Sequence, residues 1–193
     1  MSRAKAQLER HEAAALFYAA LELRSAVEAR QLEYSEALEH LQGSKIRHWN
    51  IAETHKRLRS NSYVDAIAHM RFEQGENVLD LFHVPVSSEL KNQAEKLGDL
   101  LHAQAEYRLP ADVFWTQLRE RLVKIYRATW LVSQGNCLVP PLMDKDGTLH
   151  PLKIEWPILD SDLLANLDFS IGAKMHTRIR YLTEAPIDWL CDL

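Results

Sequence analysis

Apolar residues recur along the first forty residues with the spacing of one helix face. Placed at intervals of about 100° around a helix axis, they fall on a single stripe: Leu16, Ala20, Leu23, Val27, Tyr34, Leu38 and Leu41. The pattern predicts a helix from about Ala4 or Leu8 to Leu41, ended by Gly43. A helix of this length either spans the whole domain or breaks near His11.

Charged residues approach this stripe in the segment ELRSAVEAR, from Glu22 to Arg30. Arg24 lies close to the stripe, and Glu28 follows one helical turn later on the same flank. Because an unpaired buried ion is costly, we expect Arg24 and Glu28 to form a structural salt bridge at the rim of the core. A functional role for Arg24 is the alternative.

The opposite face of the same helix is small enough for a second helix to approach closely. Its members are Ala14, Ala15, Ala19, Ala26, Ala29 and Tyr18.

Three shorter elements are predicted after Gly43. Capping patterns open one helix over residues 51–59 and another over 63–74, which Gly75 ends. Residues 77–84 are apolar without helical spacing, so we expect an extended segment there.

Two longer helices follow. Ser87 or Ser88 caps the first of them, which continues to about residue 107. The second covers residues 111–133 and is closed by Gly135.

The composition changes at Pro140 and Pro141. Residues 142–156 are typical of two short strands joined by a turn at 144–147, and 161–167 of one or two helical turns. Residues 176–183 alternate as in a half-buried strand, which puts the side chains of His176, Arg178 and Arg180 on one face.

With 193 residues, of which 47% are hydrophobic and 26% charged, the chain can bury one sizeable core. We therefore predict a mainly α fold, with a helical bundle of about five helices and a small appendage that contains β structure. The bundle covers residues 1–135, and the α+β appendage, packed on the bundle, covers residues 136–193.

Membrane and secretory classes are not indicated, because no apolar run approaches the length of a membrane span and the N-terminus lacks the apolar core of a signal peptide. We therefore expect a cytoplasmic protein with no membrane partner. Cys137 and Cys191 lie far apart without metal-ligand spacing, and Asp144 to Gly147 is typical of a turn rather than of a calcium loop. The sequence predicts no metal site and no cofactor.

A basic segment stands out in a chain whose net charge is −4. It can bind the phosphates of a polyanion, with a tryptophan available for stacking, and the candidate residues are Lys45, Arg47, Trp49, Lys56, Arg57 and Arg59. A solvated helix surface is the alternative.

The chain contains no catalytic triad arrangement, phosphate-binding glycine loop or nucleotide fingerprint. An enzyme is therefore not the favoured reading. Histidine suits acid–base chemistry near neutral pH, and a neighbouring arginine stabilises a phosphorane. On these grounds the candidate catalytic residues are Arg47, His48, His55 and His102.

ELRSAVEAR in a long first helix, a short basic stretch and LGDLLHA before another long helix together resemble helical domains of the HEPN superfamily, over residues 12–132. That resemblance implies an α-helical bundle, often dimeric, of the kind found in prokaryotic defence, toxin–antitoxin and RNA-processing systems. Active members cut RNA with an arginine followed a few residues later by a histidine. The chain lacks this motif, since Arg47 and His55 are spaced too widely.

The favoured prediction is therefore a non-catalytic binding module that forms a homodimer and engages a protein or RNA partner. The first alternative is a metal-independent endoribonuclease with a degenerate HEPN-type site. The second is a structural subunit of a larger complex, whose C-terminal strands add to a partner's sheet and place Arg178 and Arg180 at the contact.

Overall fold

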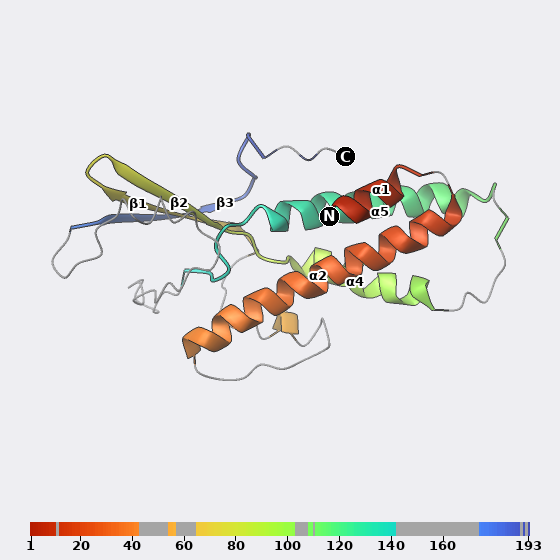
Figure 1. Cartoon of the computed structure of the whole chain (residues 1–193), viewed down its shortest axis with the longest axis horizontal. Coiled ribbons are helices and arrows are strands. Elements are labelled where there is room, and N and C mark those ends of the chain that lie inside the picture. Colours follow the sequence, from red (N-terminus) through yellow and green to blue (C-terminus); the bar gives the residue numbers. More distant parts are fainter. Residues whose placement is uncertain are drawn as a thin grey trace.

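The computed structural model describes residues 1–10, 12–42, 54–56, 65–102, 108–109, 111–141, 174–189, 191 and 193. These ranges form a mainly α fold, as predicted, together with a small three-stranded antiparallel sheet (Figure 1). Two of its strands lie within residues 1–135, where only helices of the bundle and one extended segment were predicted, and not in the C-terminal appendage. The helices are α1 (Ser2–Leu8), α2 (Ala13–Gln42), α4 (Ser88–Leu101) and α5 (Val113–Ser133). The strands are β1 (Ile67–Gln74), β2 (Asn77–His83) and β3 (His176–Leu182).

The N-terminal helical pattern is divided into α1 and α2, so that of the two alternatives left open by the sequence the break is the correct one. Arg119 of α5 stabilises the break, because its guanidinium donates hydrogen bonds to the backbone carbonyls of Leu8 and Arg10. Arg10 Nε also lies 2.9 Å from a carboxylate oxygen of Glu12. The chain reverses here, so that α1 lies beside α5 (Figure 1).

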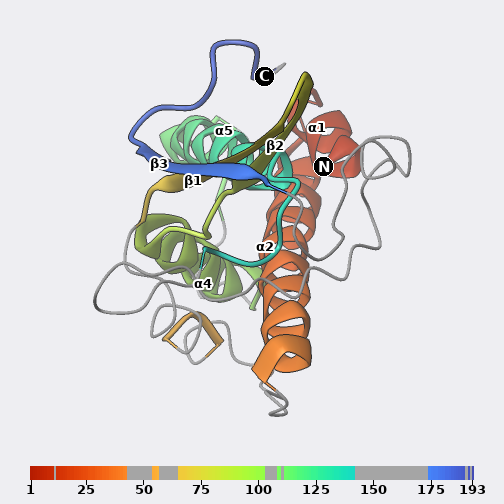
Figure 2. The ribbon, with the colours of Figure 1, turned by 90° about the vertical axis from the view of Figure 1, so that its left-hand side faces the viewer.

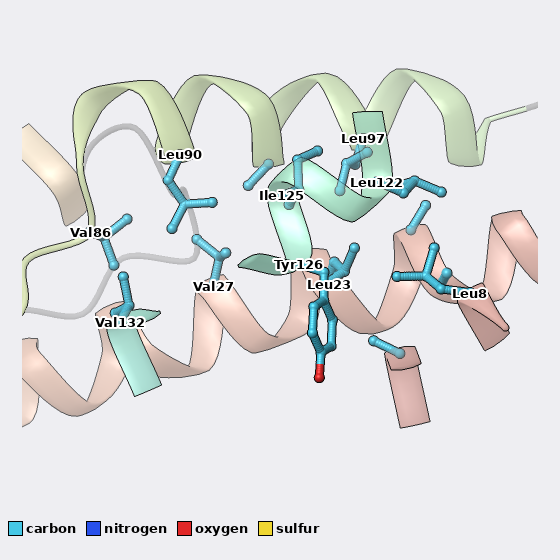
Figure 3. Packing of buried hydrophobic residues seen from close by; sticks show 14 of the residues in the cluster. Leu8, Leu23, Val27, Val86, Leu90, Leu97, Leu122, Ile125, Tyr126 and Val132 are labelled. Atoms are coloured by element: carbon cyan, nitrogen blue, oxygen red, sulfur yellow. The ribbon is translucent and has the colours of Figure 1, made fainter. Parts of the chain in front are cut away.

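The apolar face predicted for α2 forms the centre of the helical core. Leu16, Ala20, Leu23, Val27, Tyr34 and Leu38 are all buried, and the side chain of Leu41 lies outside the described residues. α2 packs against α1, α4 and α5. Figure 3 shows Leu23 and Val27 facing Leu90 and Leu97 of α4 and Ile125 of α5. Ala15 and Ala19 of the predicted small face are buried, and Ala19 shares a cluster with residues of α1.

The helix predicted over residues 63–74 is wrong, because Ile67–Gln74 is the central strand of the sheet. Its sequence, IAHMRFEQ, alternates, and Ala68, Met70 and Phe72 are buried. Tyr63, Ile67 and Met70 also fit helical spacing, so the local pattern alone was ambiguous. Pairing with strands on both sides decided the outcome.

Gly75 does not end a helix but forms the turn between β1 and β2, which adjoins the residue pair Gln74 and Asn77. Its φ of 61° suits the first central position of a two-residue hairpin, where glycine is favoured. The extended segment predicted after it is confirmed as β2.

The sheet has the order β2-β1-β3, and both pairs are antiparallel (Figure 2). Met70 lies opposite Leu81 and Ile179 on one face, which is apolar and also packs Cys137. The other face is largely polar. The predicted C-terminal strand is confirmed as β3, and it pairs with β1 from the N-terminal part of the chain.

The starts of α4 and α5 follow the predicted signals closely, but α4 ends at Leu101 and not near residue 107, because His102 already has an extended backbone. Ser87 caps α4, since its Oγ accepts from Leu90 N at 3.1 Å. Asp112 caps α5, which begins at Val113 rather than at residue 111. Gly135 follows α5 without a positive φ. Glycine suits this position because a Cβ here would lie only 3.1 Å from the carbonyl oxygen of Phe82.

Other predicted elements fall mainly outside the described residues. Of the helix predicted over 51–59, residues 54–56 are described and helical. The strands at 142–156 and the turns at 161–167 lie outside.

Candidate functional site

Arg24 and Glu28 lie where α2 meets α4. Arg24 Nε is 2.9 Å from Glu28 Oε1, and the two side chains are 35% and 39% exposed. The guanidinium rests against Gly98, where a Cβ would lie 3.3 Å from Arg24 Cζ and closer still to Nη1. Gly98 therefore leaves the space that Arg24 occupies, and the geometry is that of a packing contact between two helices.

Most of the residues proposed from the basic segment lie outside the described part of the chain, namely Lys45, Arg47, His48, Trp49, Arg57 and Arg59. Lys56 is described and exposed. His55 is buried, with Nε2 3.4 Å from the Oγ of Ser88 at the start of α4. His102 is exposed at the other end of α4. A helix of this length separates the two histidines by roughly 20 Å, so the structure does not bring them together.

A buried polar junction that the sequence reasoning missed joins α2, α5 and the end of β2. Arg30 of α2 donates from Nη2 to the carbonyl oxygens of Val132 at 3.2 Å and Gly135 at 2.7 Å, which closes the C-terminus of α5. Its Nε lies 3.0 Å from the hydroxyl of Tyr34, and that hydroxyl donates to the carbonyl oxygen of Val84 at 2.5 Å. One arginine and one tyrosine thus connect three elements.

His83 and Cys137 extend this junction. The ring of His83 lies 5.0 Å from that of Tyr34, and its Nδ1 is 3.0 Å from the carbonyl oxygen of Cys137, to which it donates. Burial lowers the pKa of His83 to about 4 and raises that of Tyr34 to about 12. Burial also raises the pKa of the Cys137 thiol to about 11. All three groups are therefore neutral near pH 7, which suits a structural junction and not a nucleophilic centre.

The polar face of the sheet carries a row of charged side chains across three strands. Arg71 of β1 lies directly between Asp80 of β2 and Arg178 of β3. The next row along the strands places His69 between Phe82 and Arg180.

The acids of this face already have cationic or histidine partners. Asp80 lies 2.6 Å from His69 Nε2 and 3.6 Å from Arg71 Nη1, and Glu73 lies 2.8 Å from Arg71 Nε. Arg178 and Arg180 are exposed, and neither forms an ion pair with any residue that the structure describes. The alternating pattern of β3 had indicated this pair of arginines, whereas their position beside Arg71 depends on strand pairing.

Comparisons with known proteins found no family model, no curated protein and no solved structure that matches this chain. The HEPN resemblance therefore stays a prediction. Of the helices in the described ranges, none is both long enough and apolar enough to cross a bilayer.

Proposed function

We propose that the chain is a non-catalytic binding module, in which a helical bundle carries a small sheet whose polar face binds single-stranded RNA. The observation that carries the proposal is the placement of Arg178 directly opposite Arg71, with Arg180 in the next row. Like charges opposite each other destabilise an antiparallel pair. A bound phosphate would reverse that effect, since arginine donates to phosphate from a planar fork.

The arrangement along β3 favours a linear polyanion over a single anion. His176, Arg178 and Arg180 occupy successive positions on one face of the strand, about 6.6 Å apart. All three are exposed. A track of two arginines and a histidine along one strand matches the way in which single-stranded nucleic acid is held by its backbone.

Fluorescence anisotropy of a labelled single-stranded oligouridine tests this proposal in low salt. The double variant R178Q/R180Q is expected to bind at least about tenfold more weakly. Its affinity should also depend less on salt, because each lost phosphate contact makes the slope of log K against log salt concentration shallower by about 0.7. A second pair, R57Q/R59Q, tests the basic segment predicted from the sequence.

The matched control is K96Q/K124Q, which removes two positive charges from exposed positions on α4 and α5. Equal losses in this control and in R178Q/R180Q would show that only net charge matters, and the sheet would not be the binding face. Electrophoresis of the RNA after incubation with metal-free protein addresses the ribonuclease alternative, because a binding module leaves the RNA intact.

Self-association is part of the same proposal and follows from the HEPN resemblance rather than from a described contact. Light scattering at tens of micromolar tests it, with a dimeric mass as the expected result. A monomeric mass at this concentration would contradict self-association. RNA binding would then still be tested by the anisotropy experiment.

A further inference from the structure

α2 carries a second row of side chains, on the side turned away from the core. Its members are all exposed and recur in steps of three and four residues: Ala14, Tyr18, Leu21, Ser25, Ala29 and Leu32, which we call the α2 stripe. Tyr18, Leu21 and Leu32 are 60%, 46% and 51% exposed. Single exposed apolar residues are ordinary, but a row at helical spacing along about 27 Å of helix is typical of an interaction surface.

Carboxylates border the α2 stripe on both sides. With positions at about 100° intervals, Glu28 lies along one border and Glu22 and Glu33 along the other. The helix contains five glutamates and two arginines. Both arginines extend from the borders toward other helices, since Arg24 packs on α4 and Arg30 reaches the end of α5, and each keeps an ion pair with a border glutamate. An approaching partner therefore meets apolar side chains with one glutamate on one side and two on the other.

These acids retain the capacity to bind a cationic partner. Glu22, Glu28 and Glu33 each have one carboxylate oxygen 2.9–3.0 Å from an arginine nitrogen of this chain. A carboxylate accepts through both of its oxygens, so a second donor can approach from outside. Glu36, one turn beyond Leu32, is exposed and forms no ion pair within the described part of the chain.

We infer that the α2 stripe binds an amphipathic helix of a partner protein, whose apolar row is bordered by lysine or arginine. Such a helix would bury Tyr18, Leu21 and Leu32 and place its cations against the glutamates. The small side chains of Ser25 and Ala29 let the two helices approach closely. A second copy of this chain fits poorly, because it would bring two glutamate borders together. An anionic membrane surface would be repelled for the same reason.

The probe is a synthetic amphipathic helix of about five turns, with leucines at the spacing of the α2 stripe and lysines on both borders. We expect the full-length chain to bind this peptide at least about tenfold more tightly than the same peptide with glutamate in place of lysine. A scrambled lysine peptide, with equal charge and no apolar row, should bind as weakly as the glutamate peptide.

Two variants test whether the peptide binds to the α2 stripe. L21S/L32S should lose at least about tenfold in affinity through the apolar row, and E36K should weaken binding while leaving the helix content unchanged by circular dichroism. V113S is the control, because Val113 is an apolar residue outside the stripe that is even more exposed, at 66%. Equal binding of the scrambled peptide, or an equal loss with V113S, would overturn the inference. So would a homodimer that L21S/L32S converts to a monomer, since the stripe would then serve a second copy.

Discussion

The imidazole of His83 is held neutral by its surroundings, and stability should therefore depend on pH. Burial lowers its pKa to about 4, against 6.5 in an unfolded chain. Between these two pH values the unfolded state binds a proton that the folded state does not, so the free energy of unfolding falls as the pH falls. At about 1.4 kcal/mol per pKa unit, the loss between pH 7 and pH 4 reaches roughly 3 kcal/mol.

Urea unfolding of the wild type and of His83→Gln from pH 7 to pH 4 measures this contribution. The variant should be less stable at pH 7 and lose less stability than the wild type on acidification. His102→Gln is the control for the removal of a histidine from an exposed position. Parallel profiles of the wild type and His83→Gln would show that His83 is protonated as easily in the folded state as in the unfolded state.

The contact of Arg24 with Gly98 makes a second prediction at the scale of residues. Alanine is favoured over glycine within a helix by about 1 kcal/mol, yet a Cβ at position 98 would displace the guanidinium of Arg24 from its place beside Glu28. Gly98→Ala should therefore stabilise the Arg24→Ala variant by up to about 1 kcal/mol and bring little or no gain to the wild type. Urea midpoints and slopes of the four proteins give the coupling. Equal effects of Gly98→Ala in both backgrounds would mean that Arg24 does not need this space.

Among the elements, the contact of α2 with the end of α5 depends on Arg30. Its guanidinium reaches two backbone carbonyls and the hydroxyl of Tyr34 from two different nitrogens, whereas lysine carries its three donors on a single nitrogen and lacks the planar fork. Arg30→Lys should lower the free energy of unfolding by about 2 kcal/mol, because buried acceptors lose their donor. Arg3→Lys, at a side chain that is 82% exposed, is the control and should be nearly neutral. An unchanged free energy of unfolding in Arg30→Lys would show that this junction does not stabilise the fold.

The elements also show how far local sequence determines this fold. The buried apolar face of α2 was predictable, because its helical period is sustained through a 30-residue helix. β1 was not, since its apolar residues satisfy two periods and one of its partners, β3, lies about a hundred residues further along the chain. The role of Arg30 was hidden for a related reason: Val132 and Gly135 contribute carbonyl groups, which leave no mark in the sequence. The same holds for the polar face of the sheet, where Arg178 could be assigned to a face but not to its neighbour Arg71.

For the whole molecule, the pairing of β1 with β3 predicts that the C-terminal part is not separable. Deleting residues 138–193 removes a strand that pairs with β1 over seven residues, together with the ring of Trp189 that lies 5.1 Å from that of Phe82. We expect the truncated chain to unfold with lower cooperativity in urea and to associate in light scattering, because an unpaired edge of β1 offers backbone groups to other chains.

Deleting residues 183–193 is the control for this truncation. It keeps β3 and should leave a cooperative transition at a lower urea midpoint, since Trp189 is lost from the contact with Phe82. A monomeric, cooperatively unfolding protein after deletion of residues 138–193 would show that the helices and the β1–β2 hairpin are stable without β3.

The same pairing sets a delay during synthesis. β1 and β2 are neighbours in the chain and can pair at once, but β3 is made about a hundred residues after β1. At about 5–20 residues per second, one edge of β1 waits for some 5–20 s before its partner leaves the ribosome. During that interval the central strand of the sheet is an edge strand, with Met70 and Phe72 on its apolar face. The nascent chain is therefore most prone to aggregation while residues 75–175 are being translated, and a chaperone that covers β1 in this period would raise the yield of folded protein.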